Sequence, residues 1–130
     1  MDKVELQDRF KKFALRIMKL ADSMPHTLSS TTIAKQIIRS GTSPYANYSA
    51  ACIAKSEKDF LNKMKMVEEE LDETHRWLEL IVDGEILPAE RMNDIIKENK
   101  ELVSIITKAI VTMRNKVNAV WHTTDCKDDC

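Results

Sequence analysis

Apolar residues recur every three or four positions along most of the chain, which is the spacing of one face of an α-helix. The pattern predicts a first helix from about Val4 to Ser23. Pro25 ends it, because proline has no N–H to donate and disfavours helix in the residue before it. The apolar line of this helix consists of Leu6, Phe10, Phe13, Ile17, Leu20 and Met24. One such line suits packing against a neighbouring helix.

A second helix is predicted to begin within LSSTTIAKQ (residues 28–36), where Ser29 or Ser30 caps the exposed amides. It continues through the unusual stretch SGTSPYANYSAA (residues 40–51), because the apolar period is unbroken there: Ala34, Ile37, Gly41, Pro44, Tyr48 and Ala51. Proline removes one helical hydrogen bond, so we expect a kink. The small residues around it permit close approach of another backbone. The alternative is a break into two helices, and the continuous period favours one kinked helix.

Two longer helices follow. The third begins at Ser56 and has the apolar line Phe60, Met64, Val67, Leu71, Thr74, Leu78 and Ile81. It ends in DGEILP (residues 83–88), where Gly84 suits the left-handed position and Pro88 suits the first turn of the next helix. The fourth helix spans roughly residues 88–120. It carries two adjacent apolar lines, one running from Met92 to Val120 and one from Ile95 to Ala109, which together are wider than one partner helix covers.

The composition agrees with this all-α interpretation. The chain has 130 residues with only two glycines and three prolines, so it has few connections and long elements. Four helices with short links predict an antiparallel up-down-up-down four-helix bundle with a kinked second helix. We expect a single domain over residues 1–121. The remaining residues, 122–130, have no apolar period and are predicted to be a disordered tail.

Several functional classes lack their sequence signals. No apolar run reaches the length of about 18 residues that a membrane span needs, and the charged N-terminus lacks the apolar core of a signal peptide. Three cysteines do not form a disulfide framework, so a cytoplasmic location is expected. The glycines are too far apart for a phosphate-binding loop. No cofactor is expected.

Charge is distributed unevenly along the chain. Residues 1–58 hold ten Lys/Arg against five Asp/Glu, whereas residues 59–130 hold ten against sixteen. The first helix carries a basic stripe that we define as Arg9, Lys11, Lys12, Arg16 and Lys19. Such a stripe can contact nucleic-acid phosphates. The alternative is a solvated face, or one paired with the acidic run EEELDE (residues 68–73) of the same or a neighbouring chain, and the isoelectric point near 6.3 favours this alternative.

Metal ligands are sparse. Di-iron bundles use two Glu-x-x-His motifs, and this chain has only Asp72 and His75 at that spacing. His122, Cys126 and Cys130 have a spacing that suits zinc if the tail is helical, but a closed site needs a fourth ligand. The sequence therefore predicts no metal site.

Two stretches, IAKQIIRSGTSPYANYSAA and SEKDFLNKMKMVEEELDETHRWLELI, resemble a family of bacterial four-helix-bundle proteins first found in intervening sequences of 23S ribosomal RNA genes. The matching positions are Gln36, Arg39, Ser40, Ser43, Ala46, Asn47, Ser56, Asp59, Phe60, Glu73, Trp77 and Leu78. The chain departs from the family pattern in NYSAAC, where Ala50 and Ala51 replace an acidic residue and a glycine. The resemblance spans about residues 10–110.

This resemblance implies a four-helix protomer that assembles into a ring-shaped homopentamer. The family is also similar to the accessory variability determinant of diversity-generating retroelements, which binds nucleic acid and a reverse transcriptase. The resemblance therefore implies three kinds of partner: further copies of the chain, RNA or DNA, and a nucleic-acid enzyme.

Polar residues of the second helix offer the one candidate for catalysis. Arg39, Ser40, Ser43 and Asn47 form a polar line, but no histidine lies within helical reach to activate a serine. We interpret the line, with Gln36, Asp59, Trp77 and hypothetically Glu73, as a structural hydrogen-bonded network at the kink. The expected function is a non-enzymatic oligomeric scaffold or adaptor, and the alternative is an enzyme that uses the polar line. The two differ in whether the line faces dry helix contacts or a solvent-filled cleft.

Overall fold

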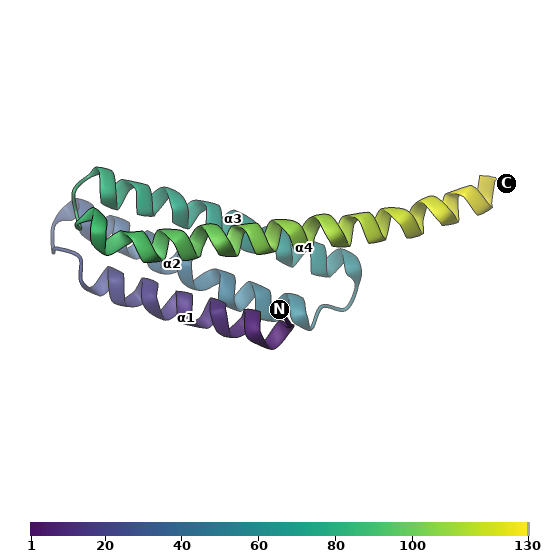
Figure 1. The fold of residues 1–130 in the computed structure, drawn as a ribbon, viewed down its shortest axis with the longest axis horizontal. Coiled ribbons are helices and arrows are strands. Elements are labelled where there is room, and N and C mark those ends of the chain that lie inside the picture. Colours follow the sequence, from purple (N-terminus) through teal and green to yellow (C-terminus); the bar gives the residue numbers. More distant parts are fainter. Residues whose placement is uncertain (130) are drawn as a thin grey trace.

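The computed structural model describes the backbone of residues 1–129 and the side chains of residues 1–118. Within these residues it contains four α-helices and no strand: α1 (Lys3–Asp22), α2 (Leu28–Cys52), α3 (Glu57–Asp83) and α4 (Ala89–Asp129). The helices alternate in direction along a common axis (Figure 1). The predicted all-α four-helix bundle is confirmed.

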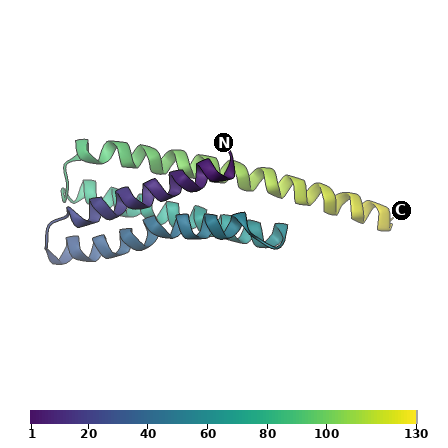
Figure 2. The same ribbon diagram turned by 90° about the horizontal axis from the view of Figure 1, so that it is seen from below.

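The helices pack in chain order. α2 contacts both α1 and α3, and α3 contacts α4, whereas the contacts between α1 and α4 are the sparsest. The C-terminal part of α4 projects beyond the other three helices (Figures 1 and 2). The bundle is thus tightly packed along three of its sides and more open along the side between α1 and α4.

The predicted apolar lines form the core. The six residues of the α1 line are all buried, and so are the α3 residues from Met64 to Ile81 that belong to its line. On α4 the buried positions are drawn from both predicted lines: Met92, Ile95, Asn99, Leu102, Ile106 and Ile110. The rings of Phe10 and Tyr48 pack with centroids 5.2 Å apart. Burial raises the pKa of the Tyr48 phenol, and the neighbouring Cys52 thiol adds to the shift.

The second helix is continuous, as predicted, with Pro44 inside it. Gly41 lies where α2 meets α1. A Cβ atom placed on Gly41 would lie 2.7 Å from Ile17 Cγ2 and 2.8 Å from Ile17 Cγ1, which is closer than carbon atoms can approach. The absence of a side chain at Gly41 therefore allows the two helices to approach this closely. This is the close packing that the small residues of α2 predict.

The helix caps were only partly predicted. Ser56 caps α3 as expected, since its side chain accepts a hydrogen bond from the amide of Asp59 at 3.0 Å. The prediction that Ser29 or Ser30 caps α2 is wrong. The cap is Thr27, whose hydroxyl accepts from the Ser30 amide at 3.2 Å. The helix begins earlier than the sequence suggested, so Ser29 and Ser30 already lie in its first turn.

The turn after α3 also differs from the prediction by one residue. Gly84 has φ −81°, and the left-handed residue is Glu85 with φ 55°. The amide of Ile86 donates to the carbonyl of Ile81, and the amide of Glu85 donates to the carbonyl of Val82, both at 3.0 Å. These two bonds define a Schellman motif whose left-handed position is Glu85. Gly84 is needed for another reason, because a Cβ atom there would lie 2.8 Å from the Leu80 carbonyl oxygen.

The fourth helix is longer than predicted. Its backbone is helical to Asp129, so the expected end near residue 120 is wrong. The side chains of residues 122–130 lie outside the described part of the chain, and the division into a domain at 1–121 and a disordered tail stays a prediction. Over the described residues, no helix is both long and apolar enough to cross a membrane.

Candidate functional site

A polar network joins α2 to α3, and its centre is Glu70. The Ser43 hydroxyl donates to the Glu70 carboxylate at 2.6 Å, and the Asn47 amide donates to the Ser43 oxygen at 3.0 Å. The Arg39 guanidinium forms ion pairs with Glu73 and, at 3.5 Å, with Glu70. The chain of bonds runs along two turns of α2 and holds that helix against α3.

The edges of the network involve three further predicted residues. The Trp77 indole N–H donates to Glu73 at 2.9 Å, and Arg39 also donates to Gln36 at 3.4 Å. Glu73 therefore joins the network as hypothesised. Asp59 does not belong to the network. Its backbone amide donates to the cap residue Ser56 at the N-terminal end of α3, far along the helix from Glu73.

Ser40, a candidate nucleophile of the alternative function, is fully buried. Its hydroxyl shares a 2.9 Å hydrogen bond with the hydroxyl of Thr74, which also lies 2.9 Å from the Glu70 carbonyl oxygen. A buried hydroxyl that is hydrogen-bonded in this way has no access to a substrate. The polar line therefore faces interhelical contacts at Ser40, and only Arg39 is largely exposed, with 52% of its side chain accessible.

The basic stripe of α1 divides into paired and unpaired members. Arg9 bonds Glu98 of α4 and, at 2.9 Å, Glu101 of α4. The hydrogen bond to Glu98 raises the pKa of Arg9 further. Lys12 pairs with Asp8 at 2.9 Å on its own helix. Within one chain, the stripe forms no ion pair with the carboxylates of EEELDE in α3, so that part of the alternative is wrong, whereas pairing with a neighbouring chain stays a prediction.

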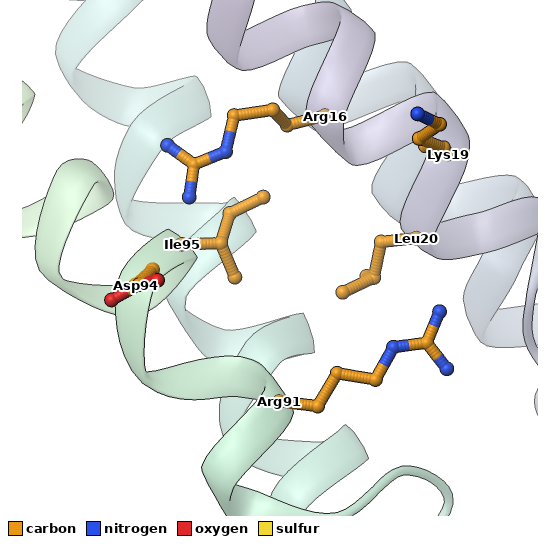
Figure 3. A pocket seen from close by; sticks show the side chains of 6 residues that line it. All are labelled: Arg16, Lys19, Leu20, Arg91, Asp94 and Ile95. Atoms are coloured by element: carbon orange, nitrogen blue, oxygen red, sulfur yellow. The ribbon is translucent and has the colours of Figure 1, made fainter.

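Arg16 and Lys19 lie at the open side of the bundle. Together with Arg91 of α4 they surround a groove whose floor is Leu20 and Ile95, and its one carboxylate is that of Asp94 (Figure 3). Among the described side chains, Arg16, Lys19 and Arg91 have no ion-pair partner. We call this feature the α1–α4 groove.

No metal centre is formed by the described residues, since no three His, Cys, Asp or Glu side chains come together in a suitable cluster. The sequence offers no second Glu-x-x-His motif opposite His75, and the His75 Nε2 atom lies 3.2 Å from a carboxylate oxygen of Glu79 on the same helix. The side chains of His122, Cys126 and Cys130 lie outside the described part of the chain, so zinc binding by the tail is untested.

The sequence pattern did not predict Glu70, Thr74 or Arg91 as functional residues. Glu70 and Thr74 lie three or four positions from Glu73 and Trp77, so all four share one face of α3. This helical spacing was the sequence signal that could have identified them. Three successive glutamates, however, point in three directions around a helix. Here Glu68 bonds Thr107 of α4, Glu69 is exposed and Glu70 bonds α2. Arg91 is not part of any basic pattern in the sequence. It becomes a candidate site residue because the fold places it opposite Arg16 and Lys19 of α1.

The fold and these contacts can be compared with known proteins. Residues 2–108 match the family described as 23S rRNA-intervening sequence protein. A comparison with curated proteins finds no match. A crystal structure of a protein with unknown function from the S23 ribosomal protein family of Bacteroides thetaiotaomicron is similar, with a TM-score of 0.79 and 33% identity. The similarity covers 85% of this chain and 98% of that one. The chain belongs to the 23S rRNA-intervening sequence protein family.

Proposed function

We propose that this protein is a non-enzymatic, homo-oligomeric helical scaffold of the cytoplasm that binds nucleic acid or a nucleic-acid enzyme. The observation that carries the proposal is the contrast between its two sets of polar side chains. The polar line of α2 is satisfied by α3, whereas Arg16 and Lys19 of α1 remain exposed and unpaired among the described residues. Exposed cations attract phosphate backbones without selecting a sequence.

Apolar side chains on the surface support self-association. Leu15 and Met18 on α1 are 53% and 44% exposed, and Val111 on α4 is 50% exposed. The α4 apolar line also continues through Met113 and Val117, which are only half-buried. A ring-shaped pentamer is the assembly that the sequence resemblance implies. In such a ring each α1 would contribute one basic stripe, and simultaneous contacts would increase the apparent affinity.

Enzymatic use of Arg39, Ser40, Ser43 and Asn47 is less well supported. Ser40 is buried, and Ser43 donates to a carboxylate that also faces Arg39. Neither serine contacts a histidine that could serve as a base in the described part of the chain.

Nucleic-acid binding is tested by fluorescence anisotropy with mixed-sequence RNA and DNA at about 50 mM salt. We expect modest affinity that does not depend on sequence and falls as salt rises, with a slope near −0.9 per phosphate contacted on duplex DNA. Arg16→Glu combined with Lys12→Glu should weaken binding at least about tenfold. The matched control, Lys65→Glu with Lys108→Glu, places the same charge change on exposed positions of α3 and α4. Equal binding by both double variants would contradict the proposed role of α1.

A further inference from the structure

We infer that the α1–α4 groove is a phosphate-binding site. The inference rests on the proposed function for the source of the phosphate, a nucleic-acid backbone. It goes beyond the basic stripe in two respects. It excludes Arg9, which is already paired with two carboxylates, and it includes Arg91, which belongs to a different helix.

The groove is built by matching turns of two antiparallel helices. On α1, Arg16, Lys19 and Leu20 lie within one turn. On α4, Arg91, Asp94 and Ile95 have the same spacing. Because the helices run in opposite directions, Lys19 and Leu20 lie at the Arg91 end of the groove and Arg16 lies toward Asp94, and Leu20 lies between the charged ends of Lys19 and Arg91 (Figure 3). Positive charge therefore dominates the end of the groove formed by Lys19 and Arg91.

The charges of the groove select an anion. Three cations face one carboxylate, that of Asp94. The planar fork of an arginine matches the oxygens of a phosphate, and a lysine adds a point charge. We place the phosphate above Leu20, where the long, exposed side chains of Lys19 and Arg91 can reach it from the two helices, and Arg16 lies on the Asp94 side of the groove. Asp94 repels an anion that moves toward it, so it limits where the phosphate binds.

The floor of the groove adds an apolar contact. Leu20 and Ile95 are 7% and 4% exposed, so they form an apolar floor that closes the bottom of the groove. A phosphate bound above them is held by side chains from both helices. A sugar attached to that phosphate can lie against the edges of the two aliphatic side chains.

The first test compares two triple variants in the full chain. Arg16→Gln, Lys19→Gln and Arg91→Gln remove the groove cations, and Lys55→Gln, Lys65→Gln and Lys108→Gln remove the same charge from exposed positions elsewhere. Circular dichroism melts establish that both are folded. We expect the groove variant to bind labelled RNA at least about tenfold more weakly than the control variant. Equal affinities would overturn the groove and the role of Arg16 and Lys19, whereas RNA binding by the natural protein in the same assay decides whether the proposed function stands.

A second variant is expected to strengthen RNA binding, an effect that loss of folding cannot produce. Asp94→Asn should tighten RNA binding by about two- to fivefold, because it removes the repelling charge beside the site. Asp72→Asn on α3 makes the same change in net charge at an exposed position. An Asp94→Asn protein that binds no better than the Asp72→Asn protein would contradict the placement of the phosphate.

The source of the phosphate is resolved by titrating inorganic phosphate and adenosine monophosphate beside the RNA. Methyl NMR signals of Leu20 and Ile95 should shift with each of the three probes, and those of Val111 should not. Shifts with the two small probes but no RNA binding would support the site and contradict the proposed function. Shifts with none of the probes would overturn the inference.

Discussion

Replacing Gly41 with leucine is expected to lower the free energy of unfolding by at least about 3 kcal/mol, a large part of the 5–15 kcal/mol typical of a domain. Even a single Cβ atom at this position would lie 2.7 Å from the Ile17 side chain. Ile17 is fully buried, and side chains in a close-packed core have little room to shift. The larger side chain would therefore force α1 and α2 apart. Urea denaturation followed by circular dichroism measures the change.

Two comparisons make this prediction specific to the helix contact. Ala46→Leu, at an exposed position of the same helix, should change stability by less than about 0.5 kcal/mol. Gly41→Ala should destabilise the natural sequence. In an Ile17→Ala background the same change should be neutral or stabilising by up to about 1 kcal/mol, because alanine is the better helix former. A Gly41→Leu protein as stable as the natural one would show that the two helices do not approach closely there.

Removing the Glu70 carboxylate is expected to cost about 2 kcal/mol. This carboxylate accepts from Ser43 at 2.6 Å and pairs with Arg39 at 3.5 Å, and only 19% of the Glu70 side chain is exposed. In Glu70→Ala the Ser43 hydroxyl loses its acceptor between α2 and α3, and Arg39 keeps Glu73 as its ion-pair partner. We expect a lower urea midpoint with an unchanged denaturant slope.

The neighbouring glutamate supplies the control. Glu69 is exposed, so Glu69→Ala should stay within about 0.5 kcal/mol of the natural protein. Glu70→Gln keeps an acceptor for Ser43 but lacks the charge that attracts Arg39, so its stability should lie between those of the two alanine variants. If Glu69→Ala and Glu70→Ala cost the same, the network does not hold α2 against α3.

The number and type of the helices could be predicted because apolar spacing reports directly on burial. Phe10, Phe13 and Ile17 recur at helical intervals, and all three are buried. The continuity of α2 through Pro44 followed from the same signal, since a loop has no reason to preserve the period. These predictions depend on many residues at once, so an error at one position has little effect.

The cap of α2 was predicted wrongly because a cap depends on a single residue. Whether Thr27 or Ser29 caps α2 changes the helix start by two residues, and both side chains can accept a hydrogen bond. The turn after α3 was misassigned in the same way. Glycine favours a left-handed φ, but here the lack of space beside the Leu80 carbonyl places glycine one residue earlier than the left-handed position.

Contacts between helices were the least predictable. The sequence gives no rotation of one helix about its axis relative to another, so it could not choose among Glu68, Glu69 and Glu70 as partners for α2. The same limit applies to Arg9, whose partners Glu98 and Glu101 are on α4 and not in the acidic run of α3. The groove formed with Arg91 depends on this arrangement as well.

The central claim, an oligomeric scaffold that binds nucleic acid, is tested most directly by sedimentation velocity with fluorescently labelled single-stranded RNA at about 50 mM salt. The label reports the mass of the particle that carries the RNA. We predict that the RNA sediments with several copies of the 14.9 kDa chain, five if the assembly is the pentamer that the resemblance implies. RNA that sediments alone, or with a single copy of the chain, would contradict the claim.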